Sequence, residues 1–356
     1  MNKIFPLLLV LVFILGLSSC QNEKSTTKLG QVDLKVTGAE AAQEHFKNGL
    51  LYLHSFEYLE ARIAFIKAQQ IDPEFGMAYW GELMAYNQPL FNKEFLKLAQ
   101  KTINKLGTTK KSRQRLFTTE IEKDLFESIE ILYGSGTKSE RNKAYSQFYE
   151  KLKKKYPKNH EVSAFYALSL LGSPRNDKTE DLYNRSARIA QSIIDENPNH
   201  PGALHYLIHS YDFPSHAHLG VIAADTYAKV APDATHALHM PSHIYLALGR
   251  WNDVVNSNID SWNASVKATQ KQPKKELGYH SLSWLHYGLL QRNEFELAKT
   301  VMNQMIKHGS SNPTTLARSY LVAMKGLNMV ETNTWSGPLA DLNFKIDDLH
   351  LSLIHI

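Results

Sequence analysis

The chain has 356 residues, of which 43% are hydrophobic and 21% are charged. This balance is that of a globular protein with a sizeable core, which excludes a disordered or collagen-like chain. The formal net charge of +5 is small for this length and is spread along the chain, so we expect no nucleic-acid partner.

The first residues predict export. A single lysine precedes an apolar run over residues 4–17, and Ser18, Ser19 and Cys20 follow it. This is the layout of a secretory signal with small residues at the cleavage site. The run is short for the roughly 20 residues of a transmembrane helix, so we favour a cleaved signal over residues 1–19 rather than a membrane anchor.

Cys20 is the only cysteine of the chain, so we expect neither disulfides nor a thiolate metal site. The segment resembles a bacterial lipoprotein signal, in which the cysteine is lipidated and becomes the first mature residue. The resemblance implies a cell-envelope protein, on the periplasmic or surface side, that is attached to the membrane through Cys20. Residues 20–38 are polar and predict a flexible tether.

A repeat begins in residues 48–73, NGLLYLHSFEYLEARIAFIKAQQIDP. Two short helices are predicted there, with Gly49 and Ala61 where their backbones cross and Tyr52 and Phe65 filling the gap. Pro73 ends the second helix because it has no backbone N–H to donate. These residues and their spacing resemble the tetratricopeptide repeat (TPR) of about 34 residues.

The same pattern recurs along the chain, with Pro157, Pro198 and Pro232 after later helical segments and residues 249–251 and 293–295 at turns between paired helices. Residues 91–157 keep only part of it, and no alternation typical of strands is found. We therefore predict an all-α protein, a TPR-like right-handed superhelical solenoid of helix hairpins over residues 39–335. Residues 336–356 lack the pattern and are expected to be a poorly determined or truncated tail.

Eight of the sixteen histidines lie within residues 200–243. In TPR proteins a concave groove is lined by fixed positions of each first helix. By that resemblance, one stretch of groove receives His205, His209, Asp212, His236, His239, His243 and His280.

Neutral imidazole is a common ligand of transition metals, and histidines at i and i+4 can share an ion. These residues therefore predict a site for zinc, iron or copper, and six imidazoles are enough for two ions. Two alternatives stay open: a polar groove that binds a peptide or protein, and ordinary packing. We expect His200 to cap the preceding turn and His286 to pack in the core, whereas His216 and His218 lie in a loop.

The motifs limit the chemistry of such a site. Neither HYLIH (205–209) nor HMPSH (239–243) contains the glutamate of a zinc-protease HExxH helix, so that mechanism is not supported. Asp212 follows His209 by three residues and is the best carboxylate ligand. Pro241 predicts a kink, or a helix that begins near His239. No separate nucleophile is evident, so a metal-bound water would be the reactive group of an enzyme, and enzymatic activity stays open.

Residues 77–91, 165–172, 200–212, 236–251 and 279–291 together resemble a group of bacterial TPR proteins with HPGxxHYxIH and HxxHMPSHI motifs. The group usually has histidine where Gln88 stands and aspartate where Ser283 stands. The repeat spacing places Trp80 on a groove position, and the resemblance adds Asn87, Gln88 and Ser283 as candidate groove contacts, but no reaction. We expect a lipid-anchored envelope protein whose histidine-rich groove binds a transition metal for metal handling or metal-dependent chemistry. The alternative is an interaction scaffold without metal or activity.

Overall fold

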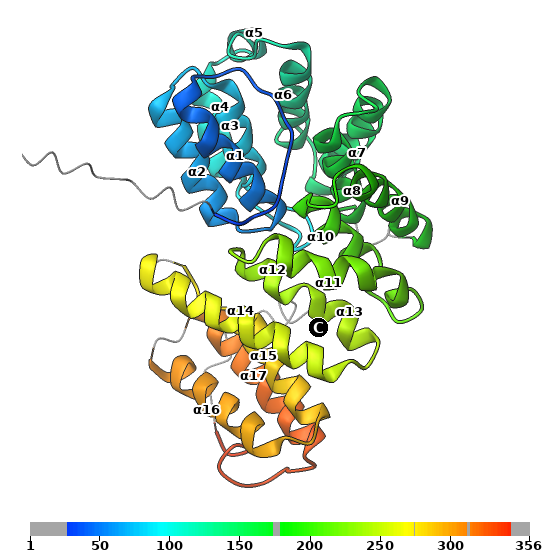
Figure 1. Cartoon of the computed structure of the whole chain (residues 1–356). Coiled ribbons are helices and arrows are strands. Elements are labelled where there is room, and N and C mark those ends of the chain that lie inside the picture. Colours follow the sequence, from blue (N-terminus) through cyan, green and yellow to red (C-terminus); the bar gives the residue numbers. More distant parts are fainter. Residues whose placement is uncertain (1–26, 174–178, 274, 312–313, 343–356) are drawn as a thin grey trace, which may run out of the picture.

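A computed structural model describes residues 27–173, 179–273, 275–311 and 314–342 of the chain, which fold into an array of packed helices (Figure 1). Cys20 and the signal lie outside these ranges. The N-terminal helices are α1 (Glu40–His54), α2 (Tyr58–Ile71), α3 (Gly76–Met84), α4 (Leu96–Leu106), α5 (Lys110–Gln114), α6 (Glu120–Leu132), α7 (Lys138–Lys155), α8 (His160–Leu171) and α9 (Glu180–Glu196). The later elements are α10 (Pro201–Ser210), the 3-10 helix η2 (Ala217–Gly220), α11 (Val221–Val230), α12 (Thr235–His239), α13 (Pro241–Ala247), α14 (Trp251–Lys271), α15 (Tyr279–Gln291), α16 (Phe295–Ser311) and α17 (Thr315–Glu331).

The repeat predicted from the sequence sets where the helices end. Helices α2, α7, α9 and α11 end at residues 71, 155, 196 and 230, and each end precedes a proline at the same interval, at 73, 157, 198 and 232. Gly49 lets α1 and α2 approach, because a Cβ there would come within 2.7 Å of the Phe65 ring. The predicted all-α class and the TPR-like helix hairpins are confirmed.

Helices α10 to α13 form the middle of the array and carry most of the candidate histidines. In Figure 1 they lie between the N-terminal helices and the group α14 to α17. One apolar core joins α1 to α10, a second joins α9 to α14 and includes Leu51 of α1, and a third joins α14 to α17. A side chain on α10 or α12 can therefore contact both neighbouring parts of the array.

Pro241 divides the helix that carries the histidine motif. Helix α12 ends at His239, and Pro241 is the first residue of α13, where its missing N–H costs no hydrogen bond. Met240 between them keeps helical angles, φ −54° and ψ −36°, and is fully buried. His236 on α12 and His243 on α13 therefore lie on one nearly continuous stretch of helical backbone.

Strands are limited to one short hairpin in the described part of the chain. Strand β1 (Asn87–Gln88) pairs antiparallel with β2 (Lys93–Glu94), and Arg141 on α7 holds Glu94 with two hydrogen bonds of 2.6 and 2.7 Å. Two residues are too few for an alternating pattern, which is why the sequence did not predict it.

Residues 27–38 correct the prediction of a free tether. Leu29 is fully buried in the second core, and Val32, Leu34 and Val36 pack against the first. The backbone N–H of Gln31 also donates to the carbonyl of Asn199 at 2.8 Å. The alternation in QVDLKV, residues 31–36, was the overlooked signal that one side of this segment is buried.

Part of the predicted tail is also ordered against the array. Lys325 on α17 donates to the carbonyls of Ala340 and Leu342 at 2.7 and 2.8 Å. Residues 343–356 lie outside the described ranges.

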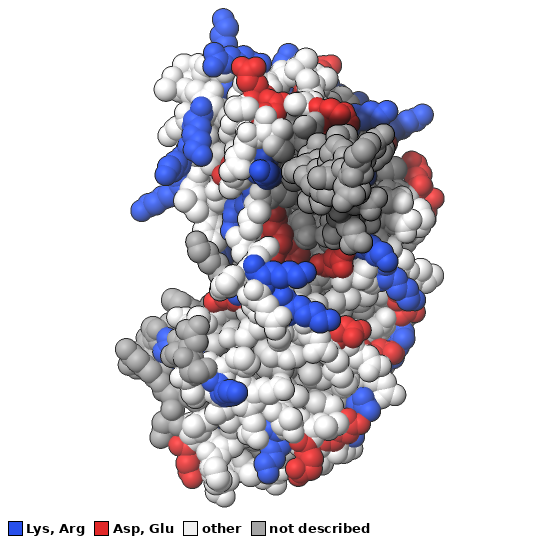
Figure 2. Space-filling model, turned by 60° about the vertical axis from the view of Figure 1, so that its left-hand side comes forward, with Lys and Arg blue, Asp and Glu red and all other residues white. Residues whose placement is uncertain are grey.

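The length and hydropathy of the helices and the distribution of basic residues bear on membrane and nucleic-acid partners. Among the described helices, none is long and apolar enough to cross a membrane. On the face shown in Figure 2, Lys and Arg lie singly or in small groups among neutral and acidic residues. The expectation of no nucleic-acid partner stays a prediction.

We predict that Leu29→Ala lowers the free energy of unfolding by about 2–5 kcal/mol, because a leucine fully buried against the second core leaves a cavity. Urea unfolding followed by circular dichroism measures the change. Leu297→Ala is the matched control, since that side chain is 54% exposed and should change stability by less than about 0.5 kcal/mol. Equal stability of the Leu29 variant and wild type would mean that residues 27–38 do not pack on the array.

Candidate metal centre

The six candidate histidines form two groups of three. The first triad is His205, His209 and His236, and the second triad is His239, His243 and His280. In each triad, ring nitrogens of the three residues lie within 4.8 Å of one another. The sequence placed these six rings in one stretch of groove and did not predict their division into two groups. His236 and His239 diverge by about 60° around α12, so His236 faces α10 and His239 faces α15.

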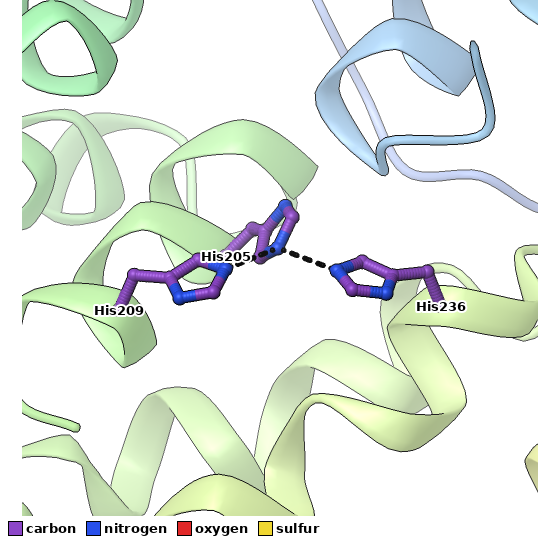
Figure 3. A group of neighbouring side chains, drawn as sticks. All are labelled: His205, His209 and His236. Atoms are coloured by element: carbon purple, nitrogen blue, oxygen red, sulfur yellow. Dashed lines mark hydrogen bonds between the residues drawn. The ribbon is translucent and has the colours of Figure 1, made fainter. Parts of the chain in front are cut away.

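The first triad is centred on His205 (Figure 3). Its Nε2 lies 3.1 Å from Nε2 of His209 and 3.2 Å from Nε2 of His236. Its Nδ1 lies 2.7 Å from the backbone carbonyl of His54, to which only a protonated nitrogen can donate. In the neutral ring, Nε2 therefore presents a lone pair to the two neighbouring imidazoles.

The second triad contains one close pair of ring nitrogens and has different outer partners. Asn258 donates through Nδ2 to the carbonyl of Val254, which fixes its Oδ1 as the acceptor for Nδ1–H of His239 at 2.7 Å. His243 donates from Nδ1 to Asp212 Oδ2 at 2.7 Å, and the Nε2 atoms of His239 and His243 lie 3.0 Å apart. The Tyr320 hydroxyl lies 3.1 Å from Nδ1 of His280.

These partners match what metal-binding histidines require. Such a histidine nearly always donates its other ring N–H to a carboxylate, carbonyl or amide, which fixes the tautomer and the ring. The Nε2 separations of 3.0 to 3.2 Å are close to the roughly 3.3 Å between nitrogens of a tetrahedral zinc site. Asp212 was predicted as a ligand, but its carboxylate accepts from Nδ1 of His243 and so orients that ring instead.

One aromatic ring covers each triad. The Phe56 ring centre lies 4.3, 6.0 and 5.6 Å from those of His205, His209 and His236. The Trp284 ring lies 5.1, 4.5 and 5.6 Å from those of His239, His243 and His280. The triads are adjacent, with 5.9 Å between the ring centres of His209 and His243. Two apolar walls thus restrict water around two neighbouring groups of nitrogens.

Phe56 reaches the first triad from an unusual backbone conformation. It occupies the turn between α1 and α2 with φ +55°, in the left-handed region that bulky residues rarely adopt. The corresponding turns before α14 and α16 use Gly249 at φ +67° and Asn293 at φ +59°, which tolerate it well. The sequence did not single out Phe56, because a phenylalanine between Ser55 and Glu57 carries no local signal of a left-handed turn.

Glu57, the next residue, fixes the start of α12. Its Oε1 accepts from the backbone N–H of His236 at 2.9 Å and from the Thr235 hydroxyl. Its Oε2 is bound by Lys275 at 2.7 Å, and Lys275 also binds Glu60 at 2.5 Å. The negative charge at a helix N-terminus is favourable and holds His236 in place.

A third group, His54, Glu161 and His200, is fully buried behind the first triad. Glu161 accepts from Nε2 of His54 at 2.6 Å and of His200 at 3.1 Å. Nδ1 of His54 lies 2.9 Å from the Tyr206 hydroxyl, and Nδ1 of His200 accepts from the backbone N–H of Ala203 at 3.1 Å. Every ring nitrogen of His54 and His200 has a hydrogen-bond partner in the protein, so we assign this group a structural role. His200 was predicted to cap the preceding turn; it is instead the N-cap of α10.

Burial keeps four of the triad imidazoles unprotonated. It lowers the pKa of His205 and of His280 to about 3, and it lowers the pKa of His236 and of His239 well below the ordinary value. Neighbouring imidazoles act in the same direction. For Glu161, burial alone would raise the pKa, but His54 and His200 hold it well below its usual range. At neutral pH these four triad nitrogens are therefore available as ligands.

The remaining predicted contacts lie elsewhere. Trp80 is fully buried against Phe165, so it is a core residue, which corrects its prediction as a groove contact. Ser283 is 8% exposed and donates to the carbonyl of His280. Asn87 lines a cavity of about 30 Å³ beside Phe56, and Gln88 follows it in β1.

Three further histidines that the sequence analysis considered lie outside the two triads. His286 is buried and its Nε2 lies 3.1 Å from Asn328 Oδ1, in line with a packing role. His216 contacts Ser215, Phe213 and Glu180, and His218 lies in η2.

Comparisons with known proteins give only remote similarity. No family model and no curated protein matches the sequence. Yeast Tom70 is 10% identical, with a TM-score of 0.37 over 83% of this chain and 70% of that one. The TPR domain of P58(IPK) is 11% identical, with a TM-score of 0.27 over 86% of this chain and 94% of that one. The assignment of a TPR-like fold rests on the helix pairs of the chain itself.

We predict that the metal-free protein loses stability as the pH falls from 7.5 to 5. The unfolded chain binds protons below the ordinary histidine pKa of about 6.5, whereas His205 and His280 stay neutral until their pKa of about 3. Each such histidine adds a slope that is small at pH 7.5 and approaches about 1.4 kcal/mol per pH unit below about pH 6, a range that lies above the ordinary carboxylate pKa values. Urea unfolding with a chelator present measures it.

The paired control is His205→Asn with His280→Asn, which should give a shallower pH dependence than wild type. His218→Asn should leave the slope unchanged, because that imidazole is exposed. Parallel profiles for the wild type and the double variant would contradict the assignment of neutral buried rings.

Proposed function

We propose that the chain binds two transition-metal ions, one in each histidine triad. The observation that carries this proposal is that His205, His239 and His243 each give Nδ1–H to a fixed acceptor and turn Nε2 toward a neighbouring Nε2. Hydrogen bonding alone does not explain the second triad, since in the neutral rings of His239 and His243 both Nε2 atoms carry lone pairs and lie 3.0 Å apart. A cation would satisfy them together.

The ligand set indicates which ions fit. Three imidazoles without thiolate or carboxylate suit zinc, copper, iron or nickel rather than calcium or magnesium. A trihistidine site leaves a coordination position open, as in zinc enzymes that bind a water there. Metal handling and metal-dependent chemistry are both compatible with this set.

Elemental analysis of protein dialysed against zinc should give two ions per chain. His209→Ala and His243→Ala, which alter partly exposed rings, should each lose one ion, with a loss of affinity of roughly a hundredfold or more at that triad. The double variant should lose both ions while its circular dichroism stays helical. His218→Ala, an exposed histidine outside the triads, is the control. Two folded variants that keep full metal content would refute the proposal.

The alternative, an interaction scaffold, is supported by the TPR-like helix pairs and fits the two TPR structures better than metal binding does. The cavity beside Phe56 is lined by Tyr58 and Asn87, and the buried Tyr58 Oη and Asn87 Oδ1 have no hydrogen-bond partner among the described residues. The cavity volume of about 30 Å³ is large enough for the tip of one side chain of a bound partner. A folded protein that takes up no metal in the preceding experiment would favour this function.

We also propose that the protein is attached to a bacterial envelope membrane through lipidated Cys20. The order of an apolar run, two serines and a lone cysteine supports it. When the full chain is expressed in a bacterium, labelled palmitate should enter the protein and the protein should sediment with membranes. Cys20→Ser should abolish the label, and labelling that persists in this variant would contradict the assignment.

A further inference from the structure

We infer that the two triads, once loaded with metal, bind a small oxyanion, a phosphate or a carboxylate, beside His209 and His243. This inference rests on the proposed metal sites and names the class of ligand that they would take. It follows from the charges that surround the triads.

The ligands themselves supply no negative charge. All six are imidazoles, and the outer partners of His205 and His239 are a carbonyl and an amide, which are neutral. Two divalent ions would add four positive charges. Asp212, on Nδ1 of His243, contributes one negative charge. A clear excess of positive charge is left at the paired sites.

Two nearby carboxylates, Glu57 and Glu161, add at most two negative charges, so a net positive charge remains, and neither can act as a further ligand because both oxygens of each are already engaged. Glu57 accepts from the start of α12 and is paired with Lys275. Glu161 lies behind His54 and is held by the rings of His54 and His200. Neither carboxylate hydrogen-bonds a ring of the two triads in the structure.

The surroundings make that excess costly unless an anion compensates it. Phe56 and Trp284 place aromatic rings over the triads, and His205 also stacks on Tyr227 at 5.3 Å. Unpaired charge is expensive in such a low-dielectric setting. An anion can enter, because the side chains of His243 and Asp212 are 15% and 31% exposed. An oxyanion at this opening would meet both sites, since the rings of His209 and His243 are adjacent.

The test is calorimetric titration of the full folded protein with inorganic phosphate and, in a second series, with acetate. Four samples are compared: zinc-loaded wild type, metal-free wild type, zinc-loaded His209→Ala and zinc-loaded His218→Ala. Metal content is measured on every sample by elemental analysis. Glycerol, a neutral molecule of similar size, serves as the uncharged probe.

We expect zinc-loaded wild type and His218→Ala to bind phosphate equally, and metal-free protein to bind at least about tenfold more weakly. His209→Ala should hold one ion and fall between them. Affinity for glycerol should not change with metal. If the protein holds zinc but binds phosphate and acetate no better than metal-free protein does, the inference is overturned and the metal sites stand. If the folded protein takes up no zinc, the proposed function itself fails, and the inference fails with it.

Discussion

The turn between α1 and α2 is the constraint on which the first triad depends. Within residues 54–57, the carbonyl of His54 fixes the tautomer of His205, Phe56 covers all three rings, and Glu57 caps α12 beside His236. The turn is itself held by the buried pair of His54 and Glu161. Since α10 and α12 belong to different helix pairs, this one turn relates the helices that carry the three histidines.

The second triad is held in place by residues from other parts of the chain. Its outer partners come from α14, from the residue after the α10 C-cap and from α17, and so from helices on both sides of α12 and α13. The Trp284 cover lies on α15, one turn after His280. The first triad therefore depends on the N-terminal end of the array, and the second triad depends on the correct stacking of its C-terminal helices.

The sequence predicted the features that local spacing controls. Helix ends followed from prolines such as Pro73, and the grouping of six imidazoles near one another followed from the repeat positions. The division into two triads did not, because it depends on which way α12 faces between α10 and α15. Trp80 was assigned to the groove by the same spacing, yet its ring packs on Phe165 of α8, a contact distant in sequence. The His54 carbonyl contacts the His205 ring, and the Glu57 carboxylate contacts the backbone of His236. Both contacts join residues far apart in the sequence, so no local sequence pattern predicts them.

Phe56 has a backbone conformation that a phenylalanine ordinarily avoids. A bulky residue in the left-handed region costs about 1–3 kcal/mol, and complete burial of a phenylalanine ring gains about 1.5–3 kcal/mol. These terms nearly cancel, so burial alone gives little reason to place Phe where the equivalent turns have Gly249 and Asn293. The difference between the positions is that only Phe56 lies over three imidazoles. Backbone strain at this turn is therefore better explained by the covered triad than by the fold of the repeat.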